Sequence, residues 1–207
     1  MNYESLIFDI DGTLWDSRQL VAEGYNIQLE KEGLQHLAVT AEDLRPLFGM
    51  VMTEIADAIL ASIDPSERYD LMERCMKTEN DYLFANECRI GYPKVKETLA
   101  ALSAKYRLFI VSNSQCGYPE LCIEKLGLTD YIEGHMCFGD TGTSKGQTIL
   151  TLIRKHNIGS CIYIGDTQGD LEACQEAGIP FIFCAYGLGK ADSWDAQIDS
   201  IEELLTM

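Results

Sequence analysis

The stretch that decides the fold is Leu6-Ile7-Phe8-Asp9-Ile10-Asp11-Gly12-Thr13-Leu14. Leu6 to Ile10 predicts a short buried strand, because a brief apolar run that stops at Asp-Gly fits the core of a parallel sheet. Asp9 interrupts this run, and a buried carboxylate costs desolvation energy unless it binds a cation or another partner. Asp11 follows two residues later, and Gly12 allows the backbone to turn. The stretch therefore predicts two acidic side chains at the carboxyl end of one strand.

These two acids have two simpler interpretations. Asp-Gly is a common turn signal, so Asp-x-Asp-Gly could be a turn and nothing more. A calcium loop of the EF-hand type also begins with alternating acids, but its glycine stands at the sixth position. Gly12 stands at the fourth position counted from Asp9, which excludes that loop. These residues alone do not exclude the interpretation as a plain turn.

The segment Asp9-Ile10-Asp11-Gly12-Thr13-Leu14, followed by Asp16-Ser17, resembles the first motif of the haloacid dehalogenase superfamily. The likeness is to its phosphoglycolate phosphatase-like branch. It implies an α/β fold, with a doubly wound, mainly parallel sheet and an inserted α-helical cap. It also implies that three further motifs follow in a set order along the chain.

Three later segments match those motifs in that order. The apolar run Leu108-Phe109-Ile110-Val111 leads into Ser112-Asn113, which resembles the second motif and makes these two residues binders of a phosphoryl group. Lys145 resembles the third motif, a lysine that neutralises the phosphate and the nucleophile, although Gly146 stands where the family often has Pro. The strand signal Cys161 to Ile164 leads into Gly165-Asp166-Thr167-Gln168-Gly169-Asp170, which resembles the fourth motif and its magnesium ligands.

The segment around Lys145 also nearly spells a nucleotide-binding loop. Gly139-Asp140-Thr141-Gly142-Thr143-Ser144-Lys145-Gly146 lacks the Gly before the Lys and the Ser or Thr after it that such a loop needs. A lysine in the first turn of a helix is also unfavourable next to the positive end of the helix dipole. This misfit favours a functional role for Lys145 over a merely exposed position.

Between the first and second motifs the strand signals disappear. Apolar residues from Ser17 to about Glu87 recur at helical spacing, and Thr40-x-x-Asp43 resembles a capping box. We expect residues 1–16 and 88–207 to form the α/β core domain and 17–87 to form a helical cap. By resemblance the cap closes over the active site, with hinges at Asp16-Ser17 and Cys88 to Gly91. A helical bundle that only adds stability is the alternative.

The charge of the chain limits its partners. Lys and Arg total 16 against 33 acids, giving a net charge of -17, which repels nucleic acids and anionic membranes. A phosphorylated metabolite would be repelled too, so a local cation is needed at any phosphate site. The hydrophobic fraction of 46% indicates a globular chain.

Cysteine and histidine patterns give little sign of other chemistry. The eight cysteines contain no Cys-x-x-Cys pair and are expected to be small buried hydrophobes in a reducing compartment. His36, His135 and His156 have no ligand spacing, so no zinc site is expected. The N-terminal residues carry no signal peptide and nothing later approaches a membrane span, so we expect a soluble cytoplasmic protein.

The resemblance implies a mechanism. Mg²⁺ would bind Asp9, Asp166, the backbone carbonyl of Asp11 and Asp170. Asp9 would attack the phosphorus of a small phosphomonoester and form an aspartyl-phosphate, with Lys145 cancelling negative charge. Asp11 would protonate the leaving alkoxide and then accept a proton from the hydrolytic water.

The sequence therefore predicts a magnesium-dependent phosphatase, a monomer or small homo-oligomer, with phosphoglycolate as the leading substrate. A phosphomutase of the same superfamily would differ mainly in cap residues. A haloacid dehalogenase would need neither Asp11 nor the metal ligands. A phospho-receiver signalling domain would also store phosphate on Asp, but it is shorter and its acceptor is not on the first strand.

Overall fold

The computed structural model describes residues 3–87 and 90–207. The chain forms two compact units, one from Met1–Asp16 and Ile90–Met207 and the other from Ser17–Arg89. They are called the sheet unit and the helical unit below. The assignment of residues 1–16 and 88–207 as a core domain and of residues 17–87 as a cap domain stays a prediction. Residues 88–89, which are part of the expected hinge from Cys88 to Gly91, lie outside the described residues.

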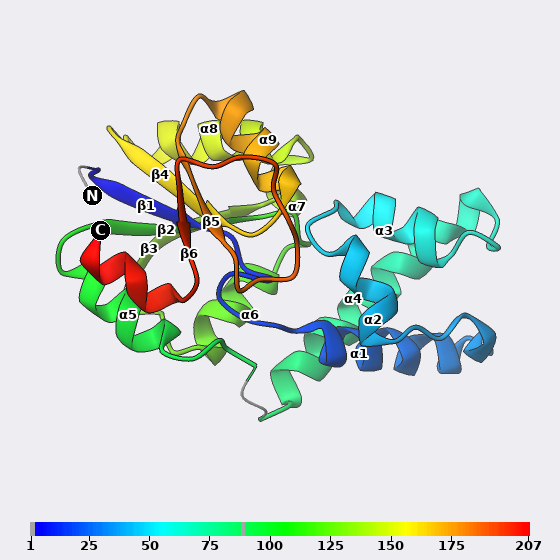
Figure 1. The fold of residues 1–207 in the computed structure, drawn as a ribbon. Coiled ribbons are helices and arrows are strands. Elements are labelled where there is room, and N and C mark those ends of the chain that lie inside the picture. The colour runs from blue at the N-terminus through cyan, green and yellow to red at the C-terminus, as the bar shows by residue number, and fades with distance from the viewer. Residues whose placement is uncertain (1–2, 88–89) are drawn as a thin grey trace. The chain divides into compact units, whose positions relative to one another are not determined.

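The sheet unit is built on six described strands that are all parallel (Figure 1). Their spatial order is β3-β2-β1-β4-β5-β6. The strands are β1 (Ser5–Phe8), β2 (Arg107–Ser112), β3 (Ile132–Cys137), β4 (Cys161–Gly165), β5 (Phe181–Cys184) and β6 (Ala196–Ile198). This confirms the predicted α/β fold with a parallel sheet.

Strand β1 lies at the centre of the sheet and is buried along its whole length. Leu6 pairs with Leu108 of β2 on one side and with Ile162 of β4 on the other. Both faces of the sheet are covered, so the strand has a continuous apolar run in place of alternation. It ends two residues earlier than the predicted Ile10, although the Asp9 amide still donates to the carbonyl of Ile164 over 2.8 Å.

Helices cover both faces of the sheet (Figure 1). On one face lie α8 (Lys145–His156) and α9 (Gln168–Ala177), and on the other lie α5 (Val95–Ser103), α6 (Tyr118–Lys125) and the 3₁₀ helix η3 (Ile201–Thr206). Beneath α8 and α9 the core packs apolar side chains from strands and helices, among them Phe109, Val111, Ile149, Leu152 and Tyr163. The fold is therefore doubly wound, as predicted.

The strand order reverses at β1. The connections from β1 to β2 and β3 run over one face, and those to β4 and β5 run over the other. The loops after β1 and β4 therefore separate at the carboxyl end of the sheet, and open α/β sheets bind ligands at such a point. The first and fourth motifs follow these two neighbouring strands.

The structure differs from the sequence predictions at several ends. The short helix α7 (Phe138–Thr141) and the edge strand β6 were not predicted, and β3 begins before the expected His135. These segments are short or polar, so the sequence shows neither the helical nor the strand periodicity of apolar residues there. The spacing Ser200-x-x-Glu203 also predicts a capping box at the start of the last helix, but this prediction is wrong, because the Ser200 side chain caps no backbone amide and instead donates to the carboxylate of Glu203.

The helical unit consists of helices and turns. Its elements are α1 (Arg18–Lys31), η1 (Gln35–Leu37), α2 (Ala41–Leu44), η2 (Arg45–Leu47), α3 (Met52–Ile59) and α4 (Pro65–Ala85). Helices α1 and α4 pack together, and Gly24 permits their close approach because a Cβ there would lie 2.7 Å from the Glu79 backbone. The predicted capping box of Thr40 and Asp43 is confirmed at the start of α2.

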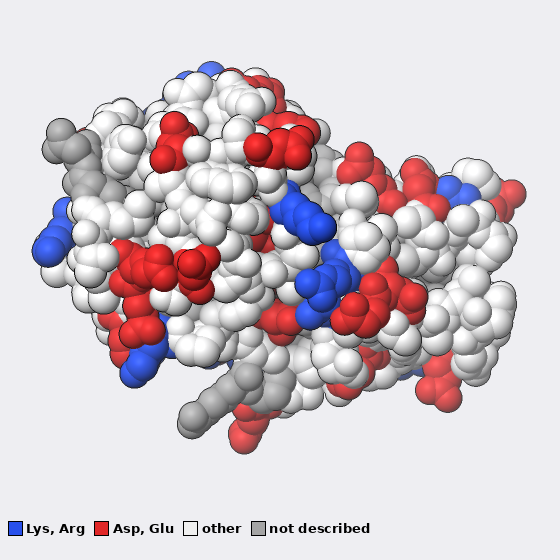
Figure 2. All heavy atoms as spheres, viewed as in Figure 1, with Lys and Arg blue, Asp and Glu red and all other residues white. Residues whose placement is uncertain are grey.

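The surface is strongly acidic. Acidic side chains are spread over the face seen in Figure 2, in keeping with the net charge of -17. Within residues 3–87 and 90–207, no helix is long and apolar enough to cross a bilayer. An anionic ligand must therefore find its positive charge locally.

Candidate active site

Three carboxylates meet at the carboxyl end of the sheet. Asp9 follows β1, Asp166 follows β4, and Asp170 lies in the first turn of α9. All three are buried, and each offers an oxygen that lies within 4.8 Å of the others. The sequence predicted these three residues as metal ligands, and the fold brings them together.

Lys145 is the cation of this cluster. Its Nζ donates to Asp9 Oδ1 over 2.8 Å and to Asp170 Oδ1 over 2.5 Å, and the residue is only 6% exposed. It is the first residue of α8, whose N-cap Ser144 accepts the amide proton of Gln147. The unfavourable helix dipole is thus outweighed by two charge-assisted hydrogen bonds.

Backbone and side-chain donors hold the other two carboxylates. Asp166 Oδ2 accepts the amide protons of Leu188 and Gly189 over 2.7 and 2.9 Å. Asp170 Oδ2 accepts from the Asp166 and Thr167 amides and from the Thr167 hydroxyl. Asp166 Oδ1 is buried with no hydrogen-bond partner. A buried carboxylate oxygen in this state costs free energy, and a bound cation would satisfy it.

The charges of the cluster are unbalanced, because three carboxylates face one ammonium group. Burial raises the pKa of Asp9 well above its usual range, although the positive charge of Lys145 lowers it. The negative charges of Asp170 and Asp166 raise the pKa of Asp9 further. Burial and the charge of Asp170 raise the pKa of Asp166 to about 7. Burial lowers the pKa of Lys145, but the two bonded carboxylates outweigh it and the net shift is upward. A divalent cation would restore neutrality with oxygen ligands, which Mg²⁺ prefers.

Two glycines make room for Asp166. Gly12 has a φ of +80°, and a Cβ there would fall inside the Asp166 carboxylate. A Cβ on Gly187 would meet the same side chain and, at 2.6 Å, the Gly12 carbonyl oxygen. The turn after Asp11 therefore needs glycine both for its backbone conformation and for the space that it leaves.

Replacing Gly12 with Ala should destabilise the fold more than the backbone strain alone explains. We expect Gly178→Ala, with a φ of +68° and nothing within 4 Å of the new Cβ, to cost about 1 kcal/mol. Gly12→Ala should cost at least about 1 kcal/mol more, because its methyl group overlaps Asp166. Urea unfolding of both variants measures the difference, and equal losses would contradict the crowding argument.

Asp11 occupies a different environment from the three buried carboxylates. Its Oδ1 accepts hydrogen bonds from Trp15 Nε1 over 2.9 Å and from the Tyr118 hydroxyl over 2.8 Å. The two donor rings pack edge to face with their centroids 5.4 Å apart. These contacts orient the Asp11 side chain, whose carboxylate is not part of the cluster of Asp9, Asp166 and Asp170. Its predicted metal contact, through the backbone carbonyl, stays a prediction.

Ser112 and Asn113 stand where β2 ends, next to the end of β1. Ser112 is buried, and its Oγ accepts the amide proton of Ser114 over 3.2 Å, which tightens the turn after the strand. Parallel strands end at one edge, so both residues share an edge of the sheet with Asp9. Their predicted binding of a phosphoryl group stays a prediction.

The sequence reasoning missed several residues that shape the site. Tyr118 contacts Asp11 from the first turn of α6, and the Gly187-Leu188-Gly189 loop holds Asp166 by its amides. In the sequence, Gly187-Leu188-Gly189 lacks the rest of a dinucleotide-binding fingerprint, so this loop was assigned no function. The signal that could have identified its role is the pair of glycines that follows the buried strand β5. Glycines in such a position allow the backbone to approach another segment closely.

Comparison with known proteins agrees with this geometry. Residues 6–184 match the haloacid dehalogenase-like hydrolase family. Phosphoglycolate phosphatase from Agrobacterium fabrum is 32% identical over 87% of this chain and 80% of its own length. Phosphoglycolate phosphatase from Xanthomonas campestris is 26% identical over 94% and 90%.

Solved structures agree in fold. A haloacid dehalogenase-like family protein from Streptococcus pneumoniae superposes with a TM-score of 0.82 at 18% identity, covering 99% of this chain and 97% of its own. A predicted phosphoglycolate phosphatase from Haemophilus somnus reaches 0.81 at 22% identity, covering 100% and 98%.

The chain therefore belongs to the haloacid dehalogenase-like hydrolase family. Within it the chain falls in the phosphoglycolate phosphatase-like branch. It is a phosphatase, a phosphoric monoester hydrolase. The predicted family and enzyme class are confirmed.

Proposed function

We propose that this phosphatase requires Mg²⁺ and hydrolyses a small phosphomonoester through an aspartyl-phosphate on Asp9. The observation that carries the proposal is the buried Asp9 carboxylate, which is bonded to Lys145 and lies within 4.8 Å of Asp166 and Asp170. Phosphoglycolate is the leading substrate, because the curated relatives bear that name. Pyrophosphate, sugar phosphates and nucleoside monophosphates are the next to test.

The donor set fits a hard divalent cation. Asp9, Asp166 and Asp170 would hold it through carboxylate oxygens, with Asp166 Oδ1 as the position that lacks another partner. When bound, the cation supplies positive charge that stabilises the transferring phosphoryl group. Lys145, the first residue of α8, adds a second positive charge next to the same carboxylates.

The protein's own groups account for the two chemical steps. In the first, an Asp9 oxygen forms a bond to phosphorus as the ester oxygen leaves, and Asp11 donates a proton to that leaving oxygen. In the second, water attacks the same phosphorus, Asp11 accepts its proton, and the bond to Asp9 breaks. Trp15 and Tyr118 keep Asp11 in one orientation for both transfers. Ser112 and Asn113 would donate hydrogen bonds to the phosphoryl oxygens.

The helical unit is proposed as the cap that selects the substrate and excludes water. The support is the path of the chain. The two connections to this unit leave the sheet unit side by side, since the Asp16 amide donates to the Ile90 carbonyl over 2.9 Å and Trp15 bridges Gly91. The outgoing connection follows the Asp9 to Asp11 loop directly along the chain. Water exclusion strengthens electrostatic interactions during phosphoryl transfer.

The test is phosphate release from a panel of small phosphomonoesters, with Mg²⁺ and with a chelator. Release that requires Mg²⁺ would support the metal dependence, and the ranking of substrates would show the preferred leaving group. Equal release in chelator would overturn the metal assignment while leaving the phosphatase activity intact. Poor use of phosphoglycolate beside another substrate would overturn only the leading substrate.

Replacing Asp11 with Asn should slow both chemical steps. An amide keeps the shape of the side chain but cannot exchange a proton, so kcat should fall by about 10²- to 10⁴-fold. The affinity for Mg²⁺, measured by calorimetry, should stay within about threefold, because the Asp11 carboxylate is not a ligand in this proposal. A large loss of Mg²⁺ affinity would instead indicate that the roles of Asp9 and Asp11 are reversed.

Mg²⁺ binding should become weaker in acid. The pKa of Asp166 without a bound cation is about 7, against a usual value of 3.8, so a proton competes with the metal below neutral pH. As the pH falls below 7, the apparent Kd for Mg²⁺ should rise by at least about tenfold per pH unit, because the pKa of Asp9, a second ligand, is raised as well. Calorimetric titrations from about pH 5 to pH 8 test this, and a flat profile would contradict it.

A further inference from the structure

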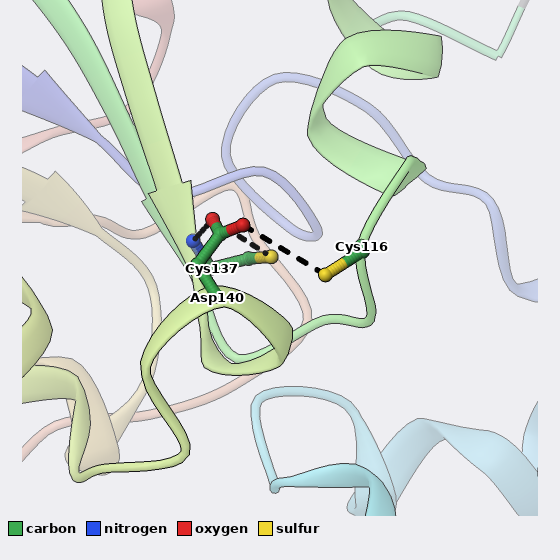
Figure 3. A group of neighbouring side chains, drawn as sticks. All are labelled: Cys116, Cys137 and Asp140. Atoms are coloured by element: carbon green, nitrogen blue, oxygen red, sulfur yellow. Dashed lines mark hydrogen bonds between the residues drawn. The ribbon is translucent and has the colours of Figure 1, made fainter.

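A second group of side chains whose atoms could hold a metal ion lies in the sheet unit and shares no residue with the cluster of Asp9, Asp166 and Asp170. It consists of Cys116, Cys137 and Asp140, called the thiol cluster here, and its ligand atoms all lie within 4.8 Å of one another. Figure 3 shows the three side chains converging from three elements: the loop before α6, the end of β3, and the short helix α7. The catalytic proposal uses none of them.

The distances in the thiol cluster suit a tetrahedral zinc ion. Cys116 Sγ lies 3.7 Å from Asp140 Oδ1, and Cys137 Sγ lies 3.3 Å from Asp140 Oδ2. With a zinc–sulfur bond of about 2.3 Å and a zinc–oxygen bond of about 2.1 Å, tetrahedral angles put sulfur and oxygen about 3.6 Å apart. Each sulfur lies within about 0.3 Å of that value from one oxygen of Asp140, but the two oxygens differ, so the carboxylate must turn slightly to offer a single oxygen to the ion.

The surroundings of the cluster hold these atoms in place. The Cys137 amide donates to Asp140 Oδ2 over 2.9 Å, which fixes the carboxylate over the end of β3. Gly139 gives Cys116 the room to approach, because a Cβ there would lie 2.8 Å from Cys116 Sγ. The Gly139 amide also donates to the Ser114 carbonyl over 3.1 Å, so the two loops are already joined beside the cluster. The site is therefore largely formed before a metal enters.

The chemistry of the donors selects the kind of metal. Two sulfurs and one carboxylate favour a borderline-soft ion such as Zn²⁺ over Mg²⁺, which takes oxygen ligands. Cys137 is buried, whereas Cys116 and Asp140 are exposed, which gives the ion a path from solvent. Three protein ligands leave the fourth tetrahedral position to water.

We propose that Cys116, Cys137 and Asp140 form a Zn²⁺ site that fastens the loop after β2 to the end of β3 and to α7. No sequence pattern indicates this site, because the two cysteines are 21 positions apart and follow no zinc-finger spacing. They meet because β2 and β3 are neighbouring parallel strands that end at the same edge.

Zinc binding at this site releases protons. Burial raises the pKa of Cys137 to about 12, and burial together with the charge of Asp140 raises the pKa of Cys116. Both sulfurs are therefore thiols at neutral pH and donate their hydrogens to Asp140. Each S–H bond breaks as a zinc–sulfur bond forms, so about two protons pass to the buffer for each Zn²⁺ bound. No oxidant or reductant takes part.

Cobalt provides a spectroscopic test on the whole, reduced protein. The protein is titrated with Co²⁺ in excess Mg²⁺, which occupies the carboxylate cluster if the catalytic proposal holds. We expect a sulfur-to-cobalt charge-transfer absorption that saturates at one equivalent and disappears when Zn²⁺ is added. Carboxylate ligands cannot produce this absorption, so the result does not depend on phosphatase activity or on where Mg²⁺ binds.

Cysteine variants identify the residues that produce the absorption. Cys116→Ser should lose it without disturbing the fold, because Cys116 is exposed, and Cys137→Ser should lose it too. Cys161→Ser, at a buried cysteine at the start of β4, should retain it. The absence of the absorption in the wild type, or its retention in Cys116→Ser, would overturn the proposal.

Alkylation gives an independent reading without any variant. Zn²⁺ should slow the reaction of Cys116 with iodoacetamide, located by peptide mass spectrometry, whereas Mg²⁺ should not. An alkylation rate of Cys116 that Zn²⁺ leaves unchanged would overturn the site. Phosphate release can fail in either experiment without bearing on this result, and zinc binding can fail without bearing on the proposed hydrolysis.

Discussion

Replacing Asp9 with Asn is expected to lower kcat by about 10⁴-fold or more, which corresponds to at least about 5 kcal/mol of lost transition-state stabilisation. The amide is nearly the same size as the carboxylate, but its oxygen is a poor nucleophile toward phosphorus. The variant loses the charge that attracts Lys145 over 2.8 Å, so binding and chemistry both suffer. Phosphate release under saturating substrate and Mg²⁺ measures the loss.

The matched control for this experiment is Asp130→Asn, the same change at an exposed position of the sheet unit. It should leave kcat unchanged. Acid quenching during turnover should also trap a phosphoryl group on Asp9 in the wild type and none in the Asn variant, as read by peptide mass spectrometry. Full activity in the Asp9 variant, or phosphate trapped on another residue, would contradict the nucleophile assignment.

Replacing Lys145 with Met is expected to be the most damaging change to stability in the site. Its side chain is 5% exposed and bonds two buried carboxylates, so its removal leaves three buried acids without a cation. Removing one partner of a buried ion pair costs about 3–5 kcal/mol. Urea unfolding in chelator measures the loss, and kcat should fall as well because the phosphoryl group loses a positive partner.

Lys77→Met is the control, because Lys77 pairs with Asp81 over a similar 2.7 Å but both side chains are more than two-thirds exposed. An exposed pair four residues apart on a helix contributes about 0.5 kcal/mol or less. Added Mg²⁺ should restore more stability to Lys145→Met than to the wild type, since the cation compensates the same carboxylates. Equal, small losses in the two variants would show that burial does not strengthen the Lys145 pairs.

Local sequence carried a large part of the fold. The apolar run before Asp9 and the run Leu108 to Val111 marked central strands, because a strand covered on both faces must be apolar throughout. The strand ends and the polar residues that follow them were therefore visible together, and the resemblance of these residues to the family's motifs is why Asp9, Asp166 and Asp170 could be named before the fold was known. The Thr40 and Asp43 capping box was visible for a similar reason, since a cap depends on residues three positions apart.

Contacts between distant segments were not visible. The bond from Tyr118 to Asp11 joins residues 107 positions apart, and the Gly189 amide reaches Asp166 from 23 positions away. The edge strand β6 is three residues long and is defined by its pairing with β5, not by its own pattern. Sequence periodicity reports burial along one element and says nothing of which loop lies across from it.

The sequence by itself determined most of the strands along the chain, the acidic residues at two strand ends, and the lysine that begins α8. Only the tertiary structure decided that Lys145 bonds both Asp9 and Asp170, that Gly12 and Gly187 leave room for Asp166, and that two cysteines meet at Asp140. The physical reason is that hydrophobic patterning is a local property of the chain. Charge pairing and metal geometry depend on distances that exist only after parallel strands place their ends at one edge of the sheet.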